Sequence, residues 1–160
     1  MTRASGDISL RRVLPADLPV LFDFQCDVVA NQMAVVNPRS SQGFAEHWDR
    51  VLADPQVFVR AVVEDGSLAG SVTCFPLHGK TWVGYWLGRR YWGRGIATQA
   101  VSLMLGDIHV RPLFARIAAS NLASCRVVER LGFVAAETCH SPATDRFPAC
   151  HETIYRLGQP

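Results

Sequence analysis

The sequence predicts a mixed α/β (α+β) domain built around one sheet. Apolar and polar residues alternate with a period of two in the middle of the chain, whereas segments on both sides carry apolar residues at helical spacing. The chain has 160 residues, of which 49% are hydrophobic, and this suits one domain with a substantial core. We therefore expect a single domain over residues 1–160.

The first third of the chain is expected to hold one strand and two helices. Residues 8–13 alternate weakly and predict the strand. The first helix is expected at residues 15–30, because it opens with proline and aspartate and then repeats apolar residues at helical spacing. Asn37-Pro38 interrupts the chain, and the second helix is expected at residues 40–52, before the break at Asp54-Pro55.

The middle of the chain predicts a meander of three strands. Residues 57–63 and 68–75 flank a turn at residues 64–67, which contains Asp-Gly and therefore indicates a hairpin. A second turn at residues 78–80 leads into a strand at residues 81–87. These strands would form the centre of an antiparallel sheet.

The last third alternates between helices and strands. Asn121 is a suitable N-cap and Gly132 a suitable C-cap for a helix between them. In order, we expect a helix at 95–109, a strand at 112–119, a helix at 122–131 and closing strands at 133–139 and 151–157.

Composition excludes several kinds of protein. Sixteen basic residues against fourteen acidic ones leave a net charge of +2, which gives no reason to expect a nucleic acid or a membrane as partner. No apolar run approaches a membrane span, and the N-terminus does not resemble a signal peptide. The five cysteines form no Cys-x-x-Cys pair, and Cys139-His140 and Cys150-His151 are poor chelates on strands, so we expect no metal. A cytoplasmic location is the expectation.

The turn after residues 81–87 has the features of a phosphate site. Gly93 and Gly95 lack a Cβ atom, so a ligand can approach the backbone closely. The following helix directs unpaired N–H groups and its positive dipole end at the turn, which suits a diphosphate. Three arginines add charge-assisted donors nearby: Arg89, Arg90 and Arg94.

Three other interpretations of this turn are open. A dinucleotide-binding turn requires a third glycine where this chain has Thr98, and it follows the first strand of its fold. A nucleoside-triphosphate loop requires Gly-Lys-Ser/Thr, which is absent here. A glycine-rich turn without a ligand is the remaining alternative.

Two sequence blocks resemble the GNAT superfamily of N-acetyltransferases. Arg90-x-x-Gly93-x-Gly95 resembles the acyl-CoA-binding signature of that superfamily, and residues 84–98 look like its ribosomal-protein-alanine acetyltransferase branch. Residues 121–133 resemble a second block of the family, in the right order and separation. The resemblance covers residues 81–133 best and is weak before residue 57.

This resemblance implies a GNAT-like fold and a way of holding acetyl-CoA. The fold is a twisted, mostly antiparallel sheet of roughly six or seven strands, flanked by about four helices. The strands at 81–87 and 112–119 would be parallel and splay apart, and the pantetheine arm would pair with the backbone of Trp86 and Leu87. The Leu87 N–H would polarise the thioester carbonyl. The pyrophosphate would be held by residues of the turn: Arg90, Gly93, Arg94, Gly95, Ile96, Ala97 and Thr98.

The second block implies further roles. Asn121 would bind the pantetheine amide in addition to capping its helix, and Arg126 would face the CoA phosphates or solvent. Many family members carry a tyrosine as general acid at the position of Val128. Ser124 lies one turn earlier and could replace it as proton donor, or it could be an ordinary first-turn serine.

The general base and the acceptor are not specified by the sequence. The related branch often has a glutamate where this chain has Trp82, and Glu46, Glu64, His47 and His78 are equally conceivable. The resemblance implies direct attack of a primary amine on acetyl-CoA in a ternary complex, the amine being a protein N-terminus or a small molecule. The alternative is a non-catalytic module that senses acyl-CoA. A homodimer through exposed strand edges is compatible with either.

Overall fold

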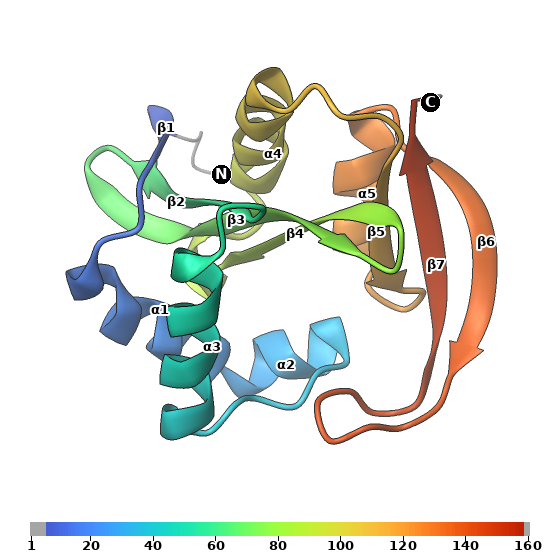
Figure 1. The fold of residues 1–160 in the computed structure, drawn as a ribbon, viewed down its shortest axis with the longest axis horizontal. Helices are drawn as coiled ribbons and strands as arrows, with labels where there is room; N and C mark the ends of the chain where they lie inside the picture. Colours follow the sequence, from blue (N-terminus) through green and yellow to red (C-terminus); the bar gives the residue numbers. More distant parts are fainter. Residues whose placement is uncertain (1–5, 159–160) are drawn as a thin grey trace.

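Seven strands form one mixed sheet in the computed structural model, which describes residues 6–158 (Figure 1). The strands lie in the order β1-β2-β3-β4-β5-β7-β6, and every neighbouring pair is antiparallel except β4 and β5. This confirms the predicted sheet. The strands are β1 (Ile8–Arg11), β2 (Phe58–Glu64), β3 (Ser67–Leu77), β4 (Lys80–Leu87), β5 (Leu113–Ala118), β6 (Val134–Ser141) and β7 (Cys150–Leu157).

Helices cover both faces of the sheet, with α1, α2 and α3 on one side and α4 and α5 on the other (Figure 1). Each side has its own apolar cluster, one with Leu21, Phe44 and Trp48 and one with Val101 and Met104. Among residues 6–158, no helix has the length and apolar character to span a bilayer. The helices are α1 (Leu18–Gln25), α2 (Val28–Ala34), α3 (Ser41–Ala53), α4 (Ile96–Asp107) and α5 (Leu122–Arg130), with 3-10 turns η1 (Pro15–Asp17) and η2 (Arg89–Tyr91).

The single helix predicted at residues 15–30 is two helices, so the prediction was wrong at this point. The chain leaves the helical conformation at Asp27, whose side chain accepts a hydrogen bond of 3.0 Å from the Ala30 N–H and caps α2. Asn31 donates to the carbonyl of Gln25 at 2.9 Å and fixes the bend. Aspartate competes in this way with helix continuation. The bend sets α2 apart from α1, opposite the ends of the central strands.

Both predicted hairpins are present, and both have two-residue turns. Asp65-Gly66 joins β2 to β3 and His78-Gly79 joins β3 to β4, with positive φ at all four residues. Turns of this kind match the twist of the strands that they connect. They fix the register that places Tyr85, Trp86 and Leu87 at the end of β4.

The parallel contact between β4 and β5 is short. Only Thr81 with Leu113 and Trp82 with Phe114 are paired, although β4 continues to Leu87. The predicted splay of these two strands is therefore present. Beyond Trp82 the two strands diverge, and a gap opens inside the sheet.

Candidate active site

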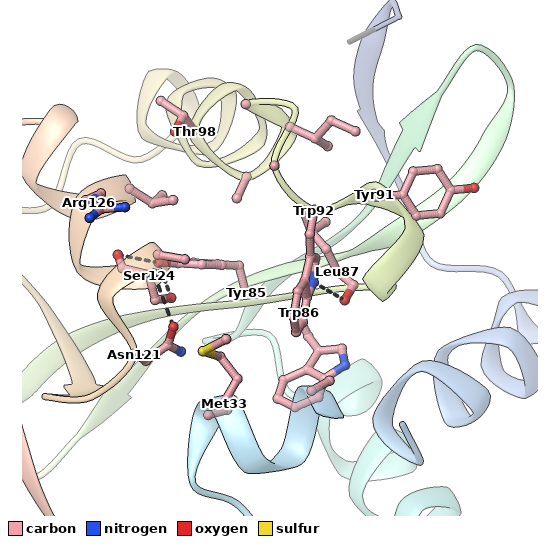
Figure 2. Close-up of a pocket in the computed structure, with 18 of the residues that line it drawn as sticks. Met33, Tyr85, Trp86, Leu87, Tyr91, Trp92, Thr98, Asn121, Ser124 and Arg126 are labelled. Carbon is pink, nitrogen blue, oxygen red and sulfur yellow. Dashed lines mark hydrogen bonds between the residues drawn. The ribbon is translucent and has the colours of Figure 1, made fainter. Parts of the chain in front are cut away.

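A cleft of about 390 Å³ lies where β4 and β5 separate, between α2, the start of α4 and α5 (Figure 2). It brings together most of the predicted cofactor-binding residues: Trp86, Leu87, Gly93, Gly95, Ile96, Ala97, Thr98, Asn121, Ser124 and Arg126. The contribution of α2, from which Met33 points into the cleft, was not predicted (Figure 2). The helix predicted at residues 15–30 ends before Met33, so nothing in the sequence placed this side chain near the site.

The glycine turn at the end of the cleft has room for a phosphate group. Gly93 and Gly95 have φ values of +71° and +76°, and a Cβ atom added to either would meet nothing within 4 Å. Gly95 caps α4 without a side-chain hydrogen bond, so the first N–H groups of the helix stay directed at the turn. The Thr98 Oγ1 atom is buried and has no hydrogen-bond partner within residues 6–158. These features fit the pyrophosphate of acetyl-CoA.

All three arginines predicted at the turn lie outside the lining of the cleft, and Arg89 forms an ion pair of 3.1 Å with Asp27. Arg94 forms an ion pair with Glu64 on β2, and both side chains are largely buried, at 15% and 8% exposure. Arg90 donates to the Tyr91 hydroxyl at 2.8 Å and its guanidinium lies 4.8 Å from the ring centre. The sequence could not show this, because the partner of Arg94 lies thirty residues earlier in the chain. Arg126 is exposed and lines the cleft.

The backbone of Leu87 faces the gap. Its neighbour Gly88 donates to the Ala69 carbonyl on β3 at 2.9 Å, and successive residues of a strand direct their polar groups to opposite sides. The Leu87 carbonyl accepts a hydrogen bond of 3.2 Å from the Trp92 indole N–H (Figure 2). The N–H of Leu87 points to that same side, where β5 has diverged.

Ser124 and Tyr85 form a hydroxyl pair across the gap (Figure 2). Their oxygen atoms are 2.8 Å apart, and the Tyr85 hydroxyl also lies 3.1 Å from the Ser124 carbonyl. Asn121 accepts a hydrogen bond of 3.3 Å from the Ser124 N–H, which confirms it as the N-cap of α5. Burial raises the pKa of Tyr85 to about 12, so its phenol stays protonated at neutral pH. Tyr85 was not among the site residues predicted from the sequence.

Of the four candidate bases, His47 lines one of two cavities formed by the described residues, and the other three line neither. Glu64 is paired with Arg94, Glu46 is exposed and accepts a hydrogen bond from Gln42, and His78 is exposed in the β3–β4 turn. Val128, at the position of the usual tyrosine, is fully buried in the core. His47 lies in a second cavity of about 180 Å³, on the side of α1 and α3. Tyr85 and Trp86 line both cavities, so the two meet at β4.

The surroundings of His47 keep its imidazole neutral. Its pKa is lowered to about 4, mainly by burial and in addition by three positive groups: Arg39 before α3, Arg50 on α3 and Arg146 in the loop between β6 and β7. A neutral imidazole can accept a proton. His47 would become a stronger base only if a negative charge nearby compensated the three arginines.

We expect the free energy of unfolding to fall as the pH drops from 6.5 to about 4, more steeply in the wild type than in His47→Gln. In this range the unfolded chain binds a proton at His47 and the native protein does not, so protonation favours unfolding. Urea unfolding of both proteins across the range checks this. The difference between them isolates His47, because the carboxylates titrate in both. Parallel curves would contradict the assignment.

The cysteine-histidine pairs lie on the neighbouring strands β6 and β7. His140 and His151 are cross-strand partners with ring centres 4.9 Å apart. All five cysteines are free thiols. Within the described part of the chain, no three His, Cys, Asp or Glu side chains are grouped to hold an ion.

Comparisons with known proteins agree with this geometry. Residues 7–134 match the family model described as acetyltransferase (GNAT) domain. The chain is 26% identical over 150 residues to a Bacillus subtilis (strain 168) protein named Putative ribosomal N-acetyltransferase YdaF, covering 82% of this chain and 80% of that protein. This agrees with the resemblance to the ribosomal-protein branch.

Solved structures share the fold at low identity. An N-acetyltransferase from Staphylococcus aureus Mu50 has a TM-score of 0.79 and 18% identity, over 95% of this chain and 98% of that one. Spermidine N-acetyltransferase from Vibrio cholerae, solved with CoA and spermine, has a TM-score of 0.76 and 16% identity, over 93% of this chain and 92% of that one. Since the family model covers most of the chain, the protein belongs to the GNAT acetyltransferase family and is an acyltransferase.

Proposed function

We propose that residues 1–160 form a single acetyl-CoA-dependent N-acetyltransferase domain that acts on a primary amine. The observation that carries this proposal is the open gap beyond the Thr81 and Trp82 pairs, with a glycine turn at one end and a hydroxyl pair across it. Acetyl-CoA would supply an acyl group activated as a thioester. The second cavity meets the cleft at β4 and would hold the part of the acceptor that lies beyond the reacting amine.

Both backbone groups and side chains of the cleft would bind acetyl-CoA. N–H groups from Gly93 to Thr98 would hold the pyrophosphate, and the backbone of Leu87 would pair with the pantetheine arm. The backbone of Trp86 is directed at Ser71 on β3 instead, so Trp86 would contribute through its side chain in the wall of the cleft. Asn121 would bind a pantetheine amide and Arg126 a phosphate. Arg90 and Arg94 would contribute through their positive charge at the turn, because their side chains lie outside the lining.

Leu87 and Ser124 would serve the chemical step. The Leu87 N–H faces the gap and would donate to the thioester oxygen, stabilising the negative charge that develops there. The Ser124 hydroxyl would give its proton to the departing sulfur. Tyr85 would hold that hydroxyl in place, because its own oxygen lies 2.8 Å from Ser124 Oγ.

Ser124→Ala is expected to lower kcat by about 10- to 100-fold and to leave the affinity for acetyl-CoA unchanged. The loss stays modest because a thiol has a pKa of about 8.5 and its thiolate is a fair leaving group. Stopped-flow detection of free thiol gives kcat, and calorimetry gives the affinity. Ser102→Ala, on the exposed face of α4, is the matched control. Tyr85→Phe should give part of the same loss; an unchanged kcat in Ser124→Ala would exclude Ser124 as proton donor.

The function itself is tested with a panel of primary amines. Peptide N-termini, amino acids, polyamines and neutral alkylamines are each incubated with protein and acetyl-CoA, and CoA release is followed against hydrolysis without amine. Saturable binding of acetyl-CoA and release with at least one amine are expected. Binding without release from any amine would establish the alternative, a module that senses acyl-CoA. No binding at all would contradict both.

A further inference from the structure

The second cavity carries positive charge that nothing in its wall neutralises. Its polar lining consists of two arginines, a histidine and four uncharged polar side chains: Arg39, Arg146, His47, Gln25, Ser71, Thr73 and Tyr85. No aspartate or glutamate lines it among residues 6–158. Neither Arg39 nor Arg146 forms an ion pair within that part of the chain.

We propose that this cavity binds a carboxylate or phosphate group of the acceptor, so that the enzyme acetylates amines that also carry an anionic group. The inference rests on the proposed function and narrows it to a substrate class. A half-buried guanidinium without an acidic partner has lost part of its hydration, and an anion that pairs with it compensates for that loss. The planar guanidinium suits both carboxylate and phosphate, because it can donate two parallel hydrogen bonds.

Both guanidinium groups are half-buried and feel each other's charge. Burial and the neighbouring Arg50 lower the pKa of Arg39. Burial and Arg39 lower the pKa of Arg146 to about 10. The Arg146 Nε atom is buried and has no hydrogen-bond partner within residues 6–158. An anion between the two side chains would offset the repulsion and supply the missing acceptor.

The arginines are held in place by the backbone around them. Gln25 on α1 donates to the Arg39 carbonyl and accepts from the Arg39 N–H, each at 3.0 Å. Asn37 donates to the Arg146 carbonyl at 2.8 Å, and the Arg146 guanidinium donates back to the Asn37 carbonyl. The loop between β6 and β7 is thereby tied to the segment after α2, as Figure 1 shows from their proximity. The positive wall is therefore built before any substrate arrives.

The cavity lies beside the cleft, so an anionic group bound in it would be close to an amine that reacts in the cleft. Tyr85 and Trp86 form a wall shared with the cleft, and the volume of about 180 Å³ accommodates only a small group. An acceptor that reaches the cleft with its amine would leave its anionic group in this cavity. A polyamine would place a cation against Arg39 and Arg146, which Coulomb repulsion disfavours.

Acceptor binding would also alter His47. Its imidazole is held neutral by burial and by Arg39, Arg50 and Arg146, from three separate segments. A bound anion offsets these charges and makes protonation easier. The acceptor would thus strengthen the one candidate base that lines the cavity.

The test compares amines that differ only in charge. Each acceptor is supplied as a free carboxylate and as its carboxamide, or as a phosphate ester and its parent alcohol; peptides carry Asp or Glu near the N-terminus against Asn or Gln. We expect kcat/KM to be about 10- to 100-fold higher for the anionic member of a pair. If no amine of any kind releases CoA, the proposed function fails. If uncharged or cationic amines react as well, the acceptor inference alone fails.

Substitutions of the two arginines test whether the preference for anionic acceptors arises in this cavity. Arg39→Gln is expected to raise KM for the anionic acceptor by about tenfold and to leave its carboxamide and acetyl-CoA unaffected. Arg146→Gln should have the same effect on KM. This variant also removes the hydrogen bond to the Asn37 carbonyl and could loosen the loop, so Arg39→Gln, which keeps that bond, is the decisive variant. Arg12→Gln is the control: Arg12 is exposed at the end of β1, so this variant removes one positive charge outside the cavity and should leave KM unchanged. The His47 NMR titration should shift to higher pH with the anionic acceptor. The proposal would be overturned if the arginine variants raised KM equally for the anionic acceptor and for its carboxamide.

Discussion

Gly95→Val is expected to abolish acetyl-CoA binding, lowering the affinity by about 100-fold or more, while the protein stays folded. The space beside Gly95 is open, and a valine side chain would fill the volume into which the helix N–H groups point. The first turn of α4 would also be disturbed, because a β-branched residue strains a φ of +76°. Calorimetry with acetyl-CoA measures the loss, and circular dichroism reports the fold.

Gly79→Val is the matched control for this effect. Gly79 has a φ of +74° and open space around its Cβ position, but it lies in the β3–β4 turn, away from the lining of the cleft. It carries the same backbone strain without blocking a ligand, so binding should survive. Full affinity in Gly95→Val would refute the glycine turn as the pyrophosphate site. Equal loss in both variants would attribute the effect to strain.

Glu64→Ala is expected to lower the free energy of unfolding by about 3–5 kcal/mol, because it leaves the Arg94 guanidinium buried without its carboxylate. For a domain of this size, the loss corresponds to a fall in Tm of roughly 10 °C. Glu64 also accepts a hydrogen bond of 2.9 Å from the Gly6 N–H, which the variant removes. Thermal unfolding measured by calorimetry tests the expectation.

Two further variants test whether the loss of stability in Glu64→Ala comes from the unpaired, buried Arg94. The double variant Glu64→Leu with Arg94→Leu should recover much of the loss, since two apolar groups replace two paired charges. Arg116→Ala removes an exposed guanidinium whose closest atom lies 3.7 Å from the carboxylate of the largely buried Glu152, and it should cost less than about 1 kcal/mol. A Glu64→Ala effect as small as that of Arg116→Ala would mean that Arg94 finds water or another partner.

Local signals in the sequence were enough to predict most of the fold and the backbone of the site. Gly93 and Gly95 mark a turn because no other residue fits its φ values easily, and Asn121 marks a helix start because its side chain caps locally. Such features depend on neighbours in the chain. The break at Asp27 was missed because the apolar spacing on either side of it continues a helical pattern.

Contacts between distant segments escaped prediction. The sequence placed Arg94 beside phosphate, whereas its partner Glu64 comes from another strand. Tyr85 is an ordinary strand residue until α5 brings Ser124 to its hydroxyl. Arg39 and Arg146 are separated by more than a hundred residues and carry no motif. Only the tertiary structure shows which side chains share a cavity.

The short β4–β5 ladder has a consequence for inhibitor design. Beyond Trp82 the main-chain N–H and C=O of Leu87 are directed into the gap, and every residue except proline carries both groups. If the pantetheine arm pairs with this backbone as proposed, a compound that mimics it would bind through groups that do not depend on which side chain stands there. Selectivity for this enzyme would have to come from an anionic extension that reaches Arg39 and Arg146, whose charges depend on side chains alone.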